Sequence, residues 1–121
     1  MRAPERLLSL AIASALLVAF AAGVAAAPDR SFGQLVAQMS PNDREGVQRT
    51  QREVLENMQP GAVAAWKDDA SGHSGEAHLL KTYQRNGMMC ADVEHILKVT
   101  VTSRYVLPLC RIGDGTWKLA Y

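Results

Sequence analysis

The spacing of apolar residues predicts two amphipathic helices in the first part of the folded chain. The first helix is short, and its apolar positions recur every three to four residues: Phe32, Leu35, Val36 and Met39. The second has one apolar stripe on a mostly charged surface, formed by Val47, Thr50, Val54, Leu55 and Met58. Ser40 and Asp43, on either side of Pro41, match a capping box at its start, and Pro60-Gly61 ends it. We expect the charged face of this helix to be solvated.

Beyond Trp66 the pattern changes from helical to alternating. Residues 67–75 are rich in Asp, Ser and Gly and are expected to form a loop. The strand-forming runs that follow are 76–84, 89–102, 105–112 and, after the turn Gly113-Asp114-Gly115, 116–121. In the run 89–102, apolar residues and His95 share one side, as in a sheet with one buried face. One or two helices followed by an antiparallel meander of about four strands predict an α+β domain, with a cystatin-like arrangement as one form of it.

The first 26 residues have the three parts of a secretory signal peptide. Arg2 and Arg6 supply the positive charge, residues 7–22 are apolar and uncharged, and small residues follow up to Ala27. We expect cleavage after Ala26. The alternative is a membrane anchor, but the apolar run is marginal for the roughly 20 residues that a spanning helix needs.

The predicted mature chain is small and electrically balanced. About 95 residues remain after cleavage, enough for a flexible leader at 27–30 and a single domain at 31–121. Basic and acidic residues are then equally numerous, which disfavours a nucleic-acid or anionic-lipid footprint. No cysteine lies near the cleavage site to carry a lipid. We therefore expect a periplasmic or outer-membrane-associated protein.

Cys90 and Cys110 are the only cysteines, and an even pair in an exported chain predicts a disulfide. In the chain-entropy model, a disulfide that closes a loop of about 20 residues stabilises the folded protein by about 3 kcal/mol. The alternative is two free buried thiols. A tight hairpin at Ser103-Arg104 would place Cys90 more than about 20 Å from Cys110, too far for a bridge. The bridge therefore requires a chain reversal near Thr100, or a Cys90 that reaches Cys110 from a crossing segment.

Several short motifs in the second half follow one another in a recognisable order. They are Trp66, Ser71-Gly72-His73-Ser74-Gly75, Cys90, Cys110-Arg111 and Asp114-Gly115-Thr116-Trp117. This order resembles the bacterial outer-membrane surface antigen domain of rickettsial type over most of the predicted mature chain. The most specific part is the spacing of Cys110, Arg111, Asp114, Gly115 and Trp117.

The chain also departs from the family pattern. Ala91 follows Cys90 where the family has Arg, Ser71 replaces Thr, and Leu107-Pro108-Leu109 precedes Cys110. The family's glycine between the two cysteines is absent. The resemblance implies an envelope location and favours the disulfide over the tight hairpin. It implies no known reaction and no catalytic residue. From the residues themselves we expect no metal and no cofactor.

The three histidines are the strongest candidates for acid–base catalysis or metal binding. His95 lies on the apolar side of its strand, where it could be an acid or base, a ligand, or a core residue with satisfied hydrogen bonds. His73 and His78, with Glu76 and Asp68-Asp69, could suggest a metal, but their spacing matches no compact ligand set. We favour a core role for His95 and ordinary turn chemistry for the loop acids.

Two features of the last turn also have alternative interpretations. Arg111 and Asp114 flank the turn and could form a local ion pair. Trp117 is expected to anchor the closing strand in the core, and the alternative is a Trp exposed at a partner surface.

Two functions are consistent with these observations. The first is a non-enzymatic envelope domain that contacts an unidentified envelope protein or outer-membrane component. The second is a small ligand-binding or isomerase-like module with a pocket near His95. A chain of about 95 residues is expected to leave little room for a pocket of roughly 300 Å³, which favours the first.

Overall fold

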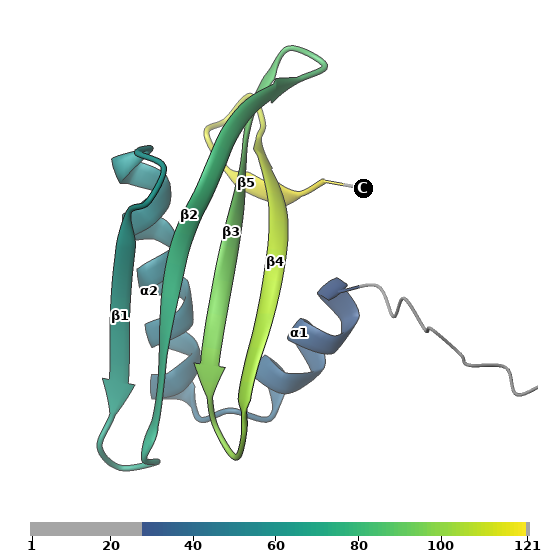
Figure 1. Ribbon diagram of the computed structural model, residues 1–121. Helices are drawn as coiled ribbons and strands as arrows, with labels where there is room; N and C mark the ends of the chain where they lie inside the picture. Colours follow the sequence, from purple (N-terminus) through teal and green to yellow (C-terminus); the bar gives the residue numbers. More distant parts are fainter. Residues whose placement is uncertain (1–27, 121) are drawn as a thin grey trace, which may run out of the picture.

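The computed structural model describes residues 28–120, so the predicted signal peptide at 1–26, its cleavage site and Tyr121 lie outside the described residues. The described chain contains two helices and five strands (Figure 1). They are α1 (Pro28–Ala37), α2 (Pro41–Asn57), β1 (Val63–Asp68), β2 (His73–Arg85), β3 (Met88–Lys98), β4 (Thr102–Arg111) and β5 (Trp117–Leu119).

The predicted cap of α2 is present in full. The Ser40 side chain accepts a hydrogen bond from the Asp43 backbone, and the Asp43 side chain accepts one from the Ser40 backbone. At the other end, Met58 adopts a left-handed conformation and its N–H donates to the Val54 carbonyl. Helix α1 begins at Pro28, so residues 28–30 of the predicted leader are helical. Proline suits this position because its φ is fixed near the helical value and its missing N–H is not needed there.

The strands form one antiparallel sheet in the order β1-β2-β3-β4-β5. Both helices lie on the same face of this sheet (Figure 1). Helix α2 packs mainly on β1 and β2, whereas α1 packs on β4. The predicted α+β arrangement is therefore confirmed, with five strands where about four were expected.

The additional strand is β1, which falls partly in a stretch that carries little strand signal. Its alanines, Ala64 and Ala65, are poor strand formers by themselves. The strand forms because Ala64 and Trp66 turn toward α2 and are buried there. Packing against the helix thus outweighs the weak local preference.

The β3–β4 hairpin places Cys90 directly opposite Cys110, and the two residues form the predicted disulfide. The pairing runs to Lys98 opposite Thr102, so the chain reverses at residues 99–101, around Thr100. The tight hairpin at Ser103-Arg104 is therefore wrong. Ser103 lies inside β4 and pairs with Leu97.

The core between sheet and helices has two parts. The larger cluster joins the C-terminal half of α2 to the middle of the sheet: Val54, Leu55, Ala64, Ala77, Leu79, Ala91, Val93, Leu107 and Leu109. The smaller cluster consists of Met39, Val47, Trp66 and Leu97. Phe32 of α1 packs against both clusters. These clusters fix α2 across the sheet, and its two ends then meet different surroundings.

Candidate functional site

His95 is buried on the helix-facing side of β3. Its side chain has no exposed surface, and its Nε2 lies 2.8 Å from Oε1 of Gln51 on α2. The Phe32 ring stacks against it with ring centroids 5.0 Å apart. Burial lowers the pKa of His95 to about 4, so the imidazole is neutral at neutral pH. Its Nδ1 has no hydrogen-bond partner among the described residues, so its polar contact is with Gln51 alone.

Asp43, at the N-terminal end of α2, is the centre of a polar network. One carboxylate oxygen, Oδ2, lies 2.6 Å from Nδ1 of His73, and the other accepts a hydrogen bond of 2.8 Å from the Ser71 hydroxyl. Burial alone would raise the pKa of Asp43. The hydrogen bonds from His73, Ser71 and Ser40 outweigh burial and lower that pKa to about 2.

This network contains the residue types of a catalytic triad but not its geometry. The Ser71 hydroxyl donates to Asp43 and also approaches the Asp68 carbonyl at 3.4 Å, so the serine proton is directed at a carboxylate and not at an imidazole. The Ser40 hydroxyl donates to the Asp68 side chain at 3.2 Å. The contacts instead tie the start of α2 to the β1–β2 loop.

Trp66 lies at the same end of the molecule and is only 4% exposed. Its indole occupies the space that a Cβ would need at Gly46 of α2 and at Gly75 of β2. Gly72 serves the neighbouring turn, where its φ of +76° disfavours any side chain. Trp66, Gly72 and Gly75 of the motif therefore hold the helix, the edge strand and the loop together.

The remaining acidic and histidine candidates do not converge on a metal. Nε2 of His78 lies 2.7 Å from the Glu76 carboxylate on the same strand, whereas His73 is bound to Asp43. Between residues 28 and 120, no group of three or more metal-binding side chains is close enough together to hold an ion.

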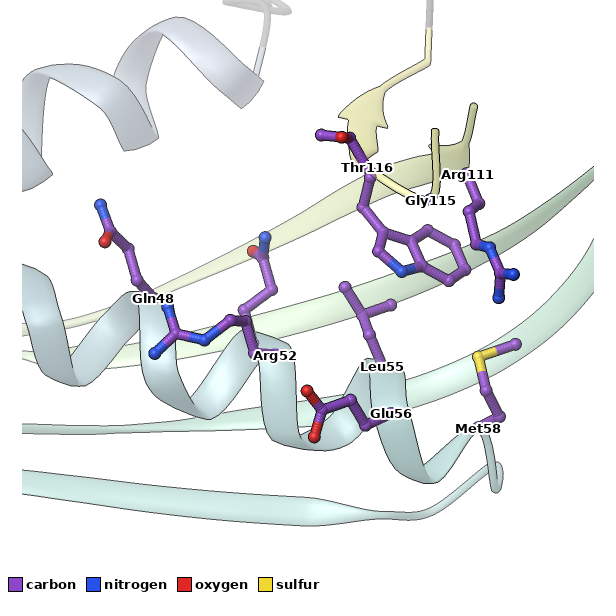
Figure 2. A pocket seen from close by; sticks show the side chains of 10 residues that line it. Gln48, Arg52, Leu55, Glu56, Met58, Arg111, Gly115 and Thr116 are labelled. Carbon is purple, nitrogen blue, oxygen red and sulfur yellow. The ribbon is translucent and has the colours of Figure 1, made fainter. Parts of the chain in front are cut away.

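The opposite end of α2 borders a cleft of about 850 Å³. One wall consists of Gln48, Arg52 and Leu55 of α2 and of Met58, which follows directly after the helix. Arg111 and the β4–β5 turn form the other wall (Figure 2). The complete lining consists of Gln48, Gln51, Arg52, Leu55, Glu56, Met58, Arg111, Gly115, Thr116 and Trp117. The sequence led us to expect little room for a pocket of roughly 300 Å³, and this open cleft is larger than that.

Trp117 has one surface in the core, as expected, and another that lines the cleft. It is partly buried and packs against the larger core cluster. The predicted ion pair between Arg111 and Asp114 is not formed. Asp114 instead accepts a hydrogen bond of 2.9 Å from the Thr116 backbone, which stabilises the turn. Arg111 makes no ion pair with any of the described residues.

The structure thus separates the motif residues into two groups. The β1–β2 loop lies at the sheet end where β3 turns into β4, whereas Arg111, Asp114, Gly115 and Trp117 lie at the end near the disulfide (Figure 1). The sequence indicated Trp117 and Arg111 but not their neighbours on α2. Gln51 lines the cleft and also bonds with His95, which itself does not line it.

No helix within residues 28–120 has the length and apolarity that crossing a membrane requires. Compared with known proteins, the chain matches no family model, no curated protein and no solved structure. The resemblance to the surface antigen domain therefore stays a prediction from the motifs.

Proposed function

We propose that this protein is an exported domain of the bacterial cell envelope that acts by binding a partner protein, without catalysing a reaction. The cleft at the C-terminal end of α2 is its recognition site. The observation that carries the proposal is the kind of side chains that line it. Trp117, Met58 and two arginines, Arg52 and Arg111, belong to the residue types enriched at protein interfaces, and Trp and Arg dominate binding hot spots.

The disulfide supports the exported location. Cys90 and Cys110 are bonded and buried, and such bridges persist in oxidising compartments such as the periplasm. The predicted signal peptide and the surface-antigen-like motifs favour the same compartment. A partner would then be an envelope protein or another outer-membrane component, and the mature domain would be periplasmic or associated with the outer membrane.

A ligand-binding or isomerase-like module is the second candidate, and the volume of the cleft favours it. About 850 Å³ lies within the range of small-molecule sites. The catalytic form of this hypothesis, however, names His95 as the residue at the pocket. His95 is fully buried and is not part of the cleft lining, so we rank binding above catalysis.

Site-specific photo-crosslinking in the native envelope tests the proposal. A photoreactive amino acid at Thr116, in the cleft, is compared with the same amino acid at Thr100, in the exposed turn at the opposite end. We expect Thr116 to give a discrete cross-linked partner in the envelope fraction and Thr100 to give none. The same cross-links from both positions, none from Thr116, or a cytoplasmic protein with two free thiols would contradict the proposal.

A further inference from the structure

We propose that the cleft receives an extended acidic segment of the partner protein, with an apolar side chain next to its carboxylates. This inference rests on the proposed binding function and specifies the chemistry of the partner. Three properties of the cleft carry it: the charges on its walls, its apolar floor and its length.

The charged lining of the cleft favours an anion. Arg52 comes from α2 and Arg111 from β4, and in Figure 2 they lie on either side of Leu55. Arg111 has no ion-pair partner among the described residues. The Arg52 contact with Glu45 is long, at 3.5 Å, and both side chains are more than half exposed. Such a pair is weak, so an incoming carboxylate can compete for Arg52. Glu56 is the single acidic residue that lines the cleft.

The floor of the cleft favours an apolar anchor beside the acidic groups. Leu55 belongs to the buried core, and Trp117 packs against the same core, so their positions are fixed. Met58 is flexible and polarisable and adapts to side chains of different shape. A purely acidic peptide would leave this surface uncovered, so aliphatic or aromatic residues among the acids fit it better.

The shape of the cleft favours an extended chain over a compact ligand. Gln48, Arg52, Leu55 and Met58 follow one another along α2 in Figure 2. At 1.5 Å per helical residue, this wall is about 15 Å long. An extended peptide advances about 3.3 Å per residue, so four to five residues would lie along it. The amide of Gln48 can bond with the backbone of such a segment, and so can the NH2 group of Gln51, whose Oε1 already bonds with His95.

The experiment selects peptides from a random 12-residue phage-display library on the mature, disulfide-bonded protein purified from the periplasm. We expect the enriched peptides to combine Asp or Glu with aliphatic or aromatic residues. A labelled enriched peptide should bind at least about tenfold more weakly when Arg52→Gln and Arg111→Gln are combined, since each removes a charge-assisted contact. Arg104→Gln should change its affinity less than about twofold, because Arg104 lies on the opposite sheet face, where it contacts Glu94.

The outcomes separate this inference from the function on which it rests. If the enriched peptides are neutral or basic and bind the Trp117→Ala variant more weakly, the proposal of an acidic segment is wrong, whereas the proposed recognition cleft stands. Peptides whose binding is unchanged by both the arginine and the Trp117 variants, or no enrichment at all, would overturn both. If vesicles of phosphatidylglycerol bind in an Arg52- and Arg111-dependent way and no acidic peptide does, the anion is a lipid headgroup and the inference is wrong.

Discussion

The two tryptophans occupy opposite ends of the sheet, and their surroundings are opposite too. Trp66 is 4% exposed and fills the gap between Gly46 and Gly75, with no room left for even a methyl group. Trp117 packs on the core with part of its surface and lines an open cleft with the rest. One tryptophan thus stabilises the fold, whereas the other leaves apolar area open in the cleft, as the proposed binding function requires.

The polar groups at the two ends differ in the same way. Around Asp43, the charged and hydroxyl groups satisfy one another within the protein and tie α2 to the β1–β2 loop. Around the cleft, Arg111 and the amide of Gln48 make no such contacts among the described residues, and Arg52 makes a weak one. The buried indole N–H of Trp66 is the exception, because it has no partner among the described residues. Otherwise, polar side chains that bond with one another are typical of a structural end, and unpaired ones beside an aromatic side chain are typical of a recognition site.

The largest effect expected from this comparison is the loss of each indole. Trp66→Ala should lower the free energy of unfolding by about 3–5 kcal/mol, because a large buried side chain is removed and the glycines on both sides cannot fill the space. Trp117→Ala should lower it by only about 1–2 kcal/mol, since Trp117 is partly solvated. Urea unfolding followed by circular dichroism measures both. Equal losses of unfolding free energy in the two variants would mean that Trp117 is as much a structural residue as Trp66.

His95 should make the fold sensitive to acid. Its pKa is about 4 in the folded protein and near 6.5 when unfolded, so between these values the unfolded state binds more protons. Stability is then complete above about pH 6.5 and decreases by about 3 kcal/mol as the pH falls to 4. The contribution of Asp43 to stability is lost only at lower pH, because its pKa is lowered from the ordinary value of 3.8 to about 2 in the folded protein.

Unfolding measured from pH 7 to 4 checks this expectation, with His95→Gln as the control. Glutamine keeps a polar group near Gln51 but does not titrate, so the variant should show a much flatter pH profile. A wild-type profile that is flat over this window would contradict a buried neutral His95.

Substitution of the glycines beside Trp66 is expected to have a smaller effect on stability. A Cβ at Gly46 would lie 2.7 Å from Cδ2 of Trp66, and one at Gly75 would lie 2.5 Å from its Nε1. Gly46→Ala and Gly75→Ala should each cost about 1–3 kcal/mol by overpacking. Gly33→Ala, in α1 with no atom within 4 Å, is the matched control and should be neutral or slightly stabilising. Thermal unfolding midpoints that fall equally for all three would rule out the tight packing around Trp66.

The smallest effect concerns two serines of the same motif. Ser71→Ala removes the 2.8 Å hydrogen bond to Asp43 and should cost about 1 kcal/mol, because a buried carboxylate loses one donor. Ser74→Ala should stay within about 0.5 kcal/mol, since the Ser74 hydroxyl bonds with none of the described residues. If Ser74 proves the more costly, the network around Asp43 does not stabilise the fold as described.

The parts of this structure that the sequence predicted are those with local causes. The cap at Ser40 and Asp43 depends on residues three positions apart. The reversal near Thr100 was one of two chain paths that a bridge between Cys90 and Cys110 allowed, and it is the one observed. His73 as a partner of Asp43 lies 30 residues away, and no short-range pattern indicates it. Strand β1 was missed because its alanines form a strand only through packing on α2.

The cleft is the clearest case of a feature that the sequence does not predict. Its walls come from residues 48–58 and 111–117, and strands β1, β2 and β3 and most of β4 lie between these segments in the sequence. Leu55 and Met58 were assigned to the inner stripe of α2, and Leu55 is indeed in the core. The angle at which α2 crosses the sheet decides how much of this stripe faces the cleft, and that angle arises from packing.

The division between a structural and a recognition end is tested most directly by the two indole N–H signals in a nitrogen–proton NMR spectrum. The chain has two tryptophans, so the mature protein has one signal for Trp66 and one for Trp117. Trp117→Phe identifies them, and an enriched acidic peptide from the library is the titrant. We expect the Trp117 signal to shift with saturation while the Trp66 signal stays in place. A shift confined to Trp66, or no shift of either signal, would contradict the recognition cleft.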